Sequence, residues 1–140
     1  MERDDDAAFA EHIENCRISN SGFRHADHIY LAWIYLRRHD YPQAEARMRE
    51  SIRRLAAHSG APHKYHETMT IAWMRLVAVG IALSPKAGTF AEFSRSHPWL
   101  FDKESVLAFW SRERLMDDAA RAHWVDPDVK PLPVLDVIPA

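Results

Sequence analysis

Hydrophobic residues recur every three or four positions along most of the chain, which predicts α-helices. We expect helices over residues 4–17, 24–38, 40–58, 64–83, 103–115 and 117–124, with a short additional helix that begins at Thr89. Glycine, proline and capping residues mark the breaks, for example at residues 19–22 and 60–62. No repeat or shift in composition suggests a domain boundary. Residues 1–140 are therefore predicted to form one all-α domain, a bundle of about five to seven helices.

The fourth predicted helix, residues 64–83, is apolar on nearly all sides, and a helix without a polar face is usually buried. We expect it at the centre of the bundle, with Arg75 interrupting its most apolar part. The third helix instead carries Glu and Arg four residues apart on its outer face, which is typical of a surface in water. Near the end of the chain, three prolines within seven residues exclude helix, so residues 126–140 are predicted to form an extended C-terminal strap.

Composition and charge narrow the functional class. The formal net charge of −2 argues against a nucleic-acid-binding protein, which needs an excess of positive charge. The single cysteine, Cys16, excludes an internal disulfide bond and suits a reducing compartment. The most apolar stretch, residues 71–83, is too short to span a bilayer, and the first residues are acidic rather than hydrophobic. We therefore expect a soluble, cytoplasmic protein that binds neither nucleic acid nor membrane.

Two short histidine clusters give the strongest functional signal. Residues 23–28 and residues 63–68 each contain two histidines, and each cluster opens an apolar helix. Only one helix separates these two, and short connections favour antiparallel neighbours, so the second and fourth helices should run parallel. Their N-terminal ends then meet. The positive ends of two helix dipoles disfavour imidazolium, so these histidines are expected to stay neutral, as metal ligands must be.

A metal centre is the leading prediction for this end of the bundle. His25, His28 and His66 are the predicted ligands, because helical bundles build transition-metal sites from side chains on facing helices. Glu67 is expected to be either a fourth ligand or the general base. Imidazole and carboxylate suit a divalent Zn, Fe, Mn, Cu or Ni ion, and the sequence does not choose among these metals.

The residues next to the predicted ligands suggest a substrate. Tyr65 is expected to donate a hydrogen bond or proton during catalysis, and Lys64 and Thr70 to orient or bind an anionic molecule. The leading hypothesis is thus a small metal-dependent enzyme of lyase, hydrolase or oxygenase type, acting on a small anionic substrate.

Other interpretations of the same residues remain open. The two helix N-termini also suit a metal-free module that binds a small anion or aromatic ligand. The chain is alternatively an interaction protein, such as a homodimer, whose histidines are incidental. Cys16 near a histidine is a further candidate nucleophile, although its apolar stripe favours a place in the core. We interpret His12, His58 and His63, taken singly, as capping or surface residues.

Three motifs resemble those of a family of small, largely uncharacterised bacterial all-helical proteins. The residues that carry the resemblance are Phe23, His25, His28, Ala32, Trp33, Tyr35, Leu36, Lys64 to Thr68, Thr70, Pro127, Asp128, Pro131, Leu132 and Pro133. The match covers about residues 20–133. The resemblance implies that both histidine clusters belong to one site, and it brings no activity with it.

Overall fold

The computed structural model describes residues 2–18 and 22–135, and in these residues it contains helices and no β-strand. The predicted break at residues 19–22 and the last part of the predicted strap, residues 136–140, therefore lie partly or wholly outside the described residues. The helices are α1 (Glu2–Glu14), α2 (His25–Arg38), α3 (Tyr41–His58), α4 (Glu67–Leu83), α5 (Phe90–Ser96), α6 (Arg112–Met116) and α7 (Asp118–Ala122), with 3₁₀ helices η2 (Pro62–Lys64), η3 (Pro98–Phe101) and η4 (Lys103–Ala108). The predicted all-α fold is confirmed.

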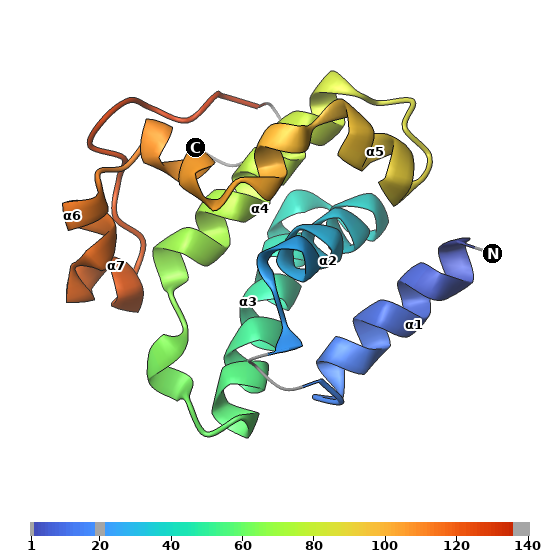
Figure 1. The fold of residues 1–140 in the computed structure, drawn as a ribbon, viewed down its shortest axis with the longest axis horizontal. Coiled ribbons are helices and arrows are strands. Elements are labelled where there is room, and N and C mark those ends of the chain that lie inside the picture. The colour runs from blue at the N-terminus through green and yellow to red at the C-terminus, as the bar shows by residue number, and fades with distance from the viewer. Residues whose placement is uncertain (1, 19–21, 136–140) are drawn as a thin grey trace.

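Helix α4 is the centre of the core, as its apolar pattern predicts. Figure 1 shows α4 running through the middle of the molecule, where α2 and α7 pack against it. Its buried side chains include Trp73, Met74 and Leu76. Gly80 lets α5 and η3 approach closely, since a Cβ at this position would lie 2.9 Å from Phe93 Cζ and 3.2 Å from Leu100 Cδ1. The core therefore depends on a small residue where α4 meets the C-terminal half of the chain.

The start of the fourth helix differs from the prediction. The sequence suggests a continuous helix from residue 64, but η2 ends at Lys64 and α4 begins at Glu67. His66 is the N-cap, because its Nδ1 accepts a hydrogen bond of 3.1 Å from the Met69 N–H. An imidazole that satisfies a free N–H of the first turn stabilises a helix start at this position.

The predicted helix over residues 103–115 is also wrong, because the backbone around Ser111 bonds to the strap instead. Phe109 O accepts a 2.9 Å hydrogen bond from Val129 N–H, and Asp128 Oδ1 accepts one of 2.8 Å from Ser111 N–H. These contacts between distant segments divide the stretch into η4 and α6. The Ser111 side chain then caps α6 by accepting from Arg114 N–H at 3.2 Å.

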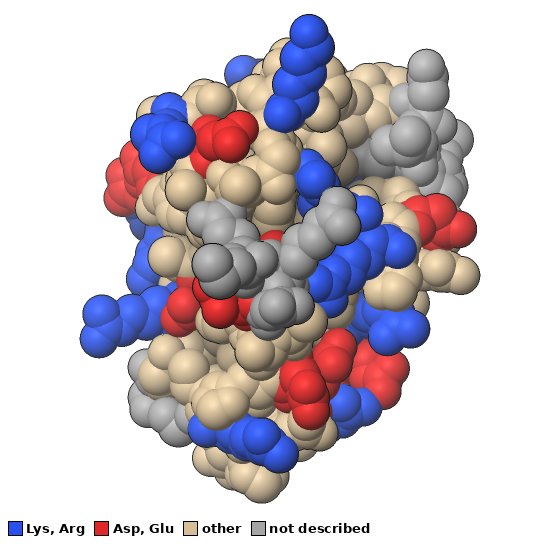
Figure 2. Space-filling model, turned by 90° about the vertical axis from the view of Figure 1, so that its right-hand side faces the viewer, with Lys and Arg blue, Asp and Glu red and all other residues tan. Residues whose placement is uncertain are grey.

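The described part of the strap, residues 126–135, has neither helix nor strand, as its prolines predict. Trp110 Nε1 donates a 3.0 Å hydrogen bond to Val125 O and fixes the point where the strap begins. On the face of the molecule in Figure 2, basic and acidic side chains are interspersed rather than separated into regions of one sign. Within the part of the chain that the structure describes, no helix has the length and hydrophobicity needed to cross a membrane.

Candidate functional site at the start of helix α4

A pocket of about 250 Å³ lies where the N-terminal ends of α2 and α4 meet. Six of the seven predicted site residues line it, and Glu67 does not. The lining consists of His25, His28, Ile52, Ala56, Lys64, Tyr65, His66, Met69, Thr70, Trp73 and Lys103. The geometric part of the sequence argument, that the two histidine clusters meet, thus agrees with the structure.

His28 is the least satisfied polar residue of the pocket. It lies in the first turn of α2, and its Nε2 is buried without a hydrogen-bond partner in the described residues. Burial, followed by the charge of neighbouring His25, lowers the pKa of His28 to about 3. This imidazole is neutral at physiological pH, and one of its nitrogens is available to a ligand.

His25 is neutral for a similar reason but has a partner. Its Nε2 donates a 2.8 Å hydrogen bond to Leu100 O, and its ring packs edge-on against Trp73 with 4.5 Å between centroids. Burial lowers the pKa of His25 and the charge of Lys103 adds to this, outweighing the Leu100 carbonyl and Asp102, which favour the protonated form. The hydrogen bond to Leu100 fixes the orientation of the ring and uses only one of its two nitrogens.

His66 uses both ring nitrogens inside the protein. Its Nδ1 accepts from Met69 N–H, and its Nε2 donates a 2.7 Å hydrogen bond to Leu115 O. Burial lowers the pKa of His66, and the charge of Arg121 adds to this, although the Leu115 carbonyl acts in the opposite direction. In this conformation neither nitrogen of His66 is free to bind a metal, and the ring instead joins α4 to the end of α6.

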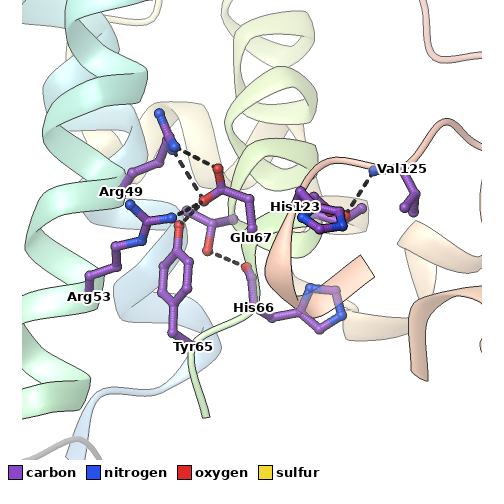
Figure 3. Close-up of polar contacts among 9 residues, drawn as sticks. Arg49, Arg53, Tyr65, His66, Glu67, His123 and Val125 are labelled. Carbon is purple, nitrogen blue, oxygen red and sulfur yellow. Dashed lines mark hydrogen bonds and ion pairs between the residues drawn. The ribbon is translucent and has the colours of Figure 1, made fainter. Parts of the chain in front are cut away.

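Glu67 does not line the pocket, and its carboxylate points toward Arg49 and Arg53 of α3 and toward Tyr65 (Figure 3). Its carboxylate is 2.7 Å from Arg49 Nη2 and 3.3 Å from Arg53 Nη2, and Tyr65 donates a 2.5 Å hydrogen bond to its Oε1. Burial alone would raise the pKa of Glu67, but hydrogen bonds from Arg49 and Tyr65 and the two arginine charges lower it overall. A carboxylate held in this way is a weak base.

The remaining predicted residues differ in how far they are already engaged. Tyr65 has a pKa raised to about 12 by burial and by its hydrogen bond to Glu67, so its hydroxyl is committed as a donor. Thr70 Oγ1 donates a 2.7 Å hydrogen bond to His66 O. Lys64 is exposed and forms no ion pair with a described residue.

Lys103 is a pocket residue that the sequence argument missed. It is exposed at the start of η4 and, like Lys64, has no ion-pair partner in the described ranges. No local pattern marks it, because it reaches the pocket through the packing of η3 and η4 beside α2, a contact between segments far apart in the chain.

The other residues singled out in the sequence lie outside the pocket. His12, His58 and His63 are exposed and do not line it. Cys16 follows α1, is partly buried and packs against the core, in agreement with the structural interpretation of this residue. The first helix therefore contributes neither His12 nor Cys16 to the pocket lining.

The described residues contain no group of three or more His, Cys, Asp or Glu side chains placed to hold a metal ion. Since both nitrogens of His66 are occupied, the metal site of His25, His28 and His66 stays a prediction that requires His66 to change its hydrogen bonds. Neither protein-family models, nor curated proteins, nor solved structures give a match to this chain.

Proposed function

We propose that the pocket at the start of α4 binds a small organic anion. The observation that carries this proposal is the charge of its lining. Among the residues that the structure describes, Lys64 and Lys103 face the pocket without ion-pair partners, and no acidic side chain lines it. Neutral His25 and His28 add polar groups without adding negative charge. A small pocket with two cationic groups favours a ligand that supplies the missing negative charge.

The apolar part of the pocket limits the shape of this ligand. Met69 and Trp73 of α4 and Ile52 and Ala56 of α3 form an apolar wall. A compact molecule with a hydrophobic or aromatic body and one carboxylate or phosphate group fits a space of about 250 Å³ that has an apolar wall and two lysines. The unpartnered Nε2 of His28 is the group best suited to hydrogen-bond the ligand, because an unsatisfied buried nitrogen gains most from a partner.

Binding has stronger support than catalysis. A general base works best when its pKa lies near the operating pH, and His28, with a pKa of about 3, is far below it. Glu67, the base suggested by the sequence, is held by two arginines outside the pocket. A bound anion next to His28 would raise its pKa, so acid–base chemistry of lyase or hydrolase type requires the ligand to be in place first.

A transition-metal site on His25 and His28 is the second candidate. Metal-binding histidines usually donate their other ring N–H to a carbonyl or carboxylate, and His25 donates in this way to Leu100 O. His28 offers a buried nitrogen without a partner. Two imidazoles leave coordination positions for an anionic ligand and water, so this version also uses the positive charge of Lys64 and Lys103.

Calorimetric titration of untagged protein with acetate, benzoate and phosphate tests anion binding. We expect at least one of these anions to bind, and the double variant Lys64→Gln/Lys103→Gln to weaken it at least tenfold. Lys86→Gln, which removes an exposed lysine elsewhere, is the matched control and should leave the affinity unchanged. If none of the three anions binds, or if the double variant binds as tightly as the parent protein, the proposal is wrong.

Elemental analysis, with added Zn²⁺ or Ni²⁺ where no metal is retained, tests the second candidate. Stoichiometric metal that is lost in His25→Ala and in His28→Ala but kept in His66→Ala supports a site on two histidines. Loss of metal in all three variants supports the three-histidine site predicted from the sequence. Failure of both ions to bind at micromolar concentration rejects a metal centre and leaves the anion-binding proposal standing on its own titration.

A further inference from the structure

A larger pocket, of about 510 Å³, lies on another side of α4, beneath the C-terminal strap. Arg75 of α4 and Trp124 line it together with strap residues 126–135. This pocket shares no lining residue with the one at the start of α4. The two are therefore separate sites on the same central helix.

Arg75 is an unusual residue for its position. It is the only charged residue between Thr68 and Leu83, in the most apolar part of the chain. Its Nε is buried without a hydrogen-bond partner, and it forms no ion pair with any residue of the described ranges. Taking charge and polar hydrogens out of water without a partner destabilises a protein, so such an arginine is expected to have a counterion when the protein is at work.

The guanidinium group is held in place by aromatic rings. It lies over the Trp124 ring, 4.5 Å from its centroid. Trp124 is fixed in turn by Trp110, which packs edge-on at 5.4 Å, and by a 3.0 Å hydrogen bond from its Nε1 to Asp126 Oδ1. The N–H groups of a guanidinium lie in its own plane, so one face can rest on an aromatic ring while the edge forms paired hydrogen bonds to a carboxylate or phosphate.

The two acids that line this pocket, Asp126 and Asp128, already accept hydrogen bonds from other groups. Asp128 accepts hydrogen bonds from the Ser111 hydroxyl at 2.6 Å and from its N–H at 2.8 Å, and Asp126 accepts from Trp124. Lys130 of the strap adds a second cation to the lining. Glu45 of α3 and Arg75 of α4 each interact with the buried phenol of Tyr41, through charge and a hydrogen bond, but no ion pair joins Glu45 to Arg75.

We propose that Arg75 is the anchor of a second ligand site, in which it binds the carboxylate or phosphate group of an organic anion held under the strap. The guanidinium pairs with the anionic group, and Lys130 adds long-range attraction. Trp124 and the strap residues Pro131 and Leu132 cover the apolar part of the ligand. The proposal is independent of the function assigned to the pocket at the start of α4.

The test follows the indole N–H signal of Trp124 by ¹H–¹⁵N NMR while benzoate is added, with Trp124→Phe to assign the signal. We expect a saturable shift with benzoate and none with benzamide, its neutral isostere. A parallel titration with inorganic phosphate shows whether the site accepts phosphate as well as carboxylate. Lys64→Gln/Lys103→Gln should leave the Trp124 response unchanged, which separates this site from the other pocket.

Variants of Arg75 decide between a ligand-binding and a structural role. Arg75→Met should weaken the benzoate response at least tenfold without lowering the melting temperature, because it removes a charge that has no counterion among the described residues. The benzoate affinity of Arg75→Lys should lie between those of the parent protein and Arg75→Met, and Lys130→Gln should weaken benzoate binding about threefold. Arg95→Gln, an exposed control on α5, should leave the benzoate response unchanged. A parent protein whose Trp124 signal ignores both benzoate and phosphate overturns the proposal. So does an Arg75→Met variant that binds normally or melts several degrees lower without losing binding.

Discussion

The charged residues of one short segment, residues 64–70, differ in whether the protein supplies their partners. On one side Glu67 is buried and surrounded by two arginines and a tyrosine hydroxyl (Figure 3). On the other side Lys64 faces a pocket whose described lining also contains Lys103 and no acid. A charge whose partners all come from the protein holds the fold together, whereas a charge without partners is available to a ligand. Among neighbouring residues of this segment, the presence or absence of a charge partner within the protein therefore distinguishes a structural role from a ligand-binding role.

The same distinction applies to the arginines. Arg49 and Arg53 reach from α3 to the carboxylate of Glu67 and connect two helices of the core. Arg75, on the central helix itself, has an aromatic neighbour and no acid partner among the described residues. The two patterns lead to different expectations for substitution. Removing a charge that has a partner in the protein should lower the free energy of unfolding. Removing a charge without such a partner should weaken ligand binding.

Replacing Glu67 is the strongest test of this comparison. We expect Glu67→Gln to lower the free energy of unfolding by about 2–4 kcal/mol, since removing one partner of a buried pair leaves the others uncompensated. The upper end is limited because the Arg49 and Arg53 side chains are 35% and 51% exposed and can turn to water. Urea denaturation at pH 7 measures the difference.

Glu50→Gln is the control for that measurement. Glu50 pairs with Arg54 one turn along the exposed face of α3, and such a pair contributes about 0.5 kcal/mol or less. The structural role of Glu67 is contradicted if Glu67→Gln changes the free energy of unfolding as little as Glu50→Gln does and instead abolishes anion binding. Glu67 would then belong to the site, as the sequence suggested.

Thr68 extends the structural side of the segment to the C-terminal region. It is fully buried, donates a 2.9 Å hydrogen bond to His123 O and accepts one of 3.2 Å from Val125 N–H. We expect Thr68→Val to cost about 1–2 kcal/mol, because the two backbone groups lose this partner. Hydrogen exchange should show faster exchange at Val125 and in the strap. Unchanged protection there would mean that the strap is held independently of α4.

The fold was predictable where periodicity alone decides structure. The apolar surface of α4 and the prolines of the strap are local signals, and both lead to the correct architecture. The boundaries at His66 and Ser111 were not predictable in the same way. The ring of His66 bonds to Leu115 and the backbone of Ser111 bonds to Asp128, and contacts over such separations leave no local pattern.

The sequence was sufficient to predict which residues of the site lie close together. Antiparallel neighbours and short connections are enough to bring His25, His28 and His66 to one pocket. Their hydrogen bonds were not predictable, although these distinguish an N-cap from a ligand. His66 looks like His28 in the sequence, yet one has both nitrogens occupied and the other has a buried nitrogen without a partner.

The buried, unpartnered His28 should make the stability of the protein depend on pH. Its pKa is about 3 in the folded protein and about 6.5 when unfolded, so the unfolded chain takes up the proton first on acidification. Stability is therefore constant above about pH 6.5 and falls as the pH drops towards 3. Glu67, whose folded pKa is also lowered, adds its own loss only below about pH 4.5. The interval between pH 6.5 and 5 thus reports on histidines alone.

Thermal unfolding at pH 7 and pH 5 measures this contribution. We expect His28→Gln to reduce the difference in stability between the two pH values by about 2 kcal/mol, because proton uptake by the unfolded chain contributes about 1.4 kcal/mol per pH unit below pH 6.5. His25 and His66 also have lowered pKa values and keep part of the slope. Exposed His63→Gln is the control and should leave the slope as it is. An unchanged slope in His28→Gln means that His28 is hydrated, and it removes the reason for assigning its nitrogen to a ligand.

The smallest expected effect on stability belongs to the two lysines of the pocket. Lys64 and Lys103 are exposed and form no ion pair with a described residue, so the double variant Lys64→Gln/Lys103→Gln should change the free energy of unfolding by about 0.5 kcal/mol or less. A slight gain is the more informative result, because two cations near one pocket repel each other until an anion binds between them. A loss of 2 kcal/mol would instead show that the lysines have partners in solution, and the contrast between the two sides of residues 64–70 would disappear.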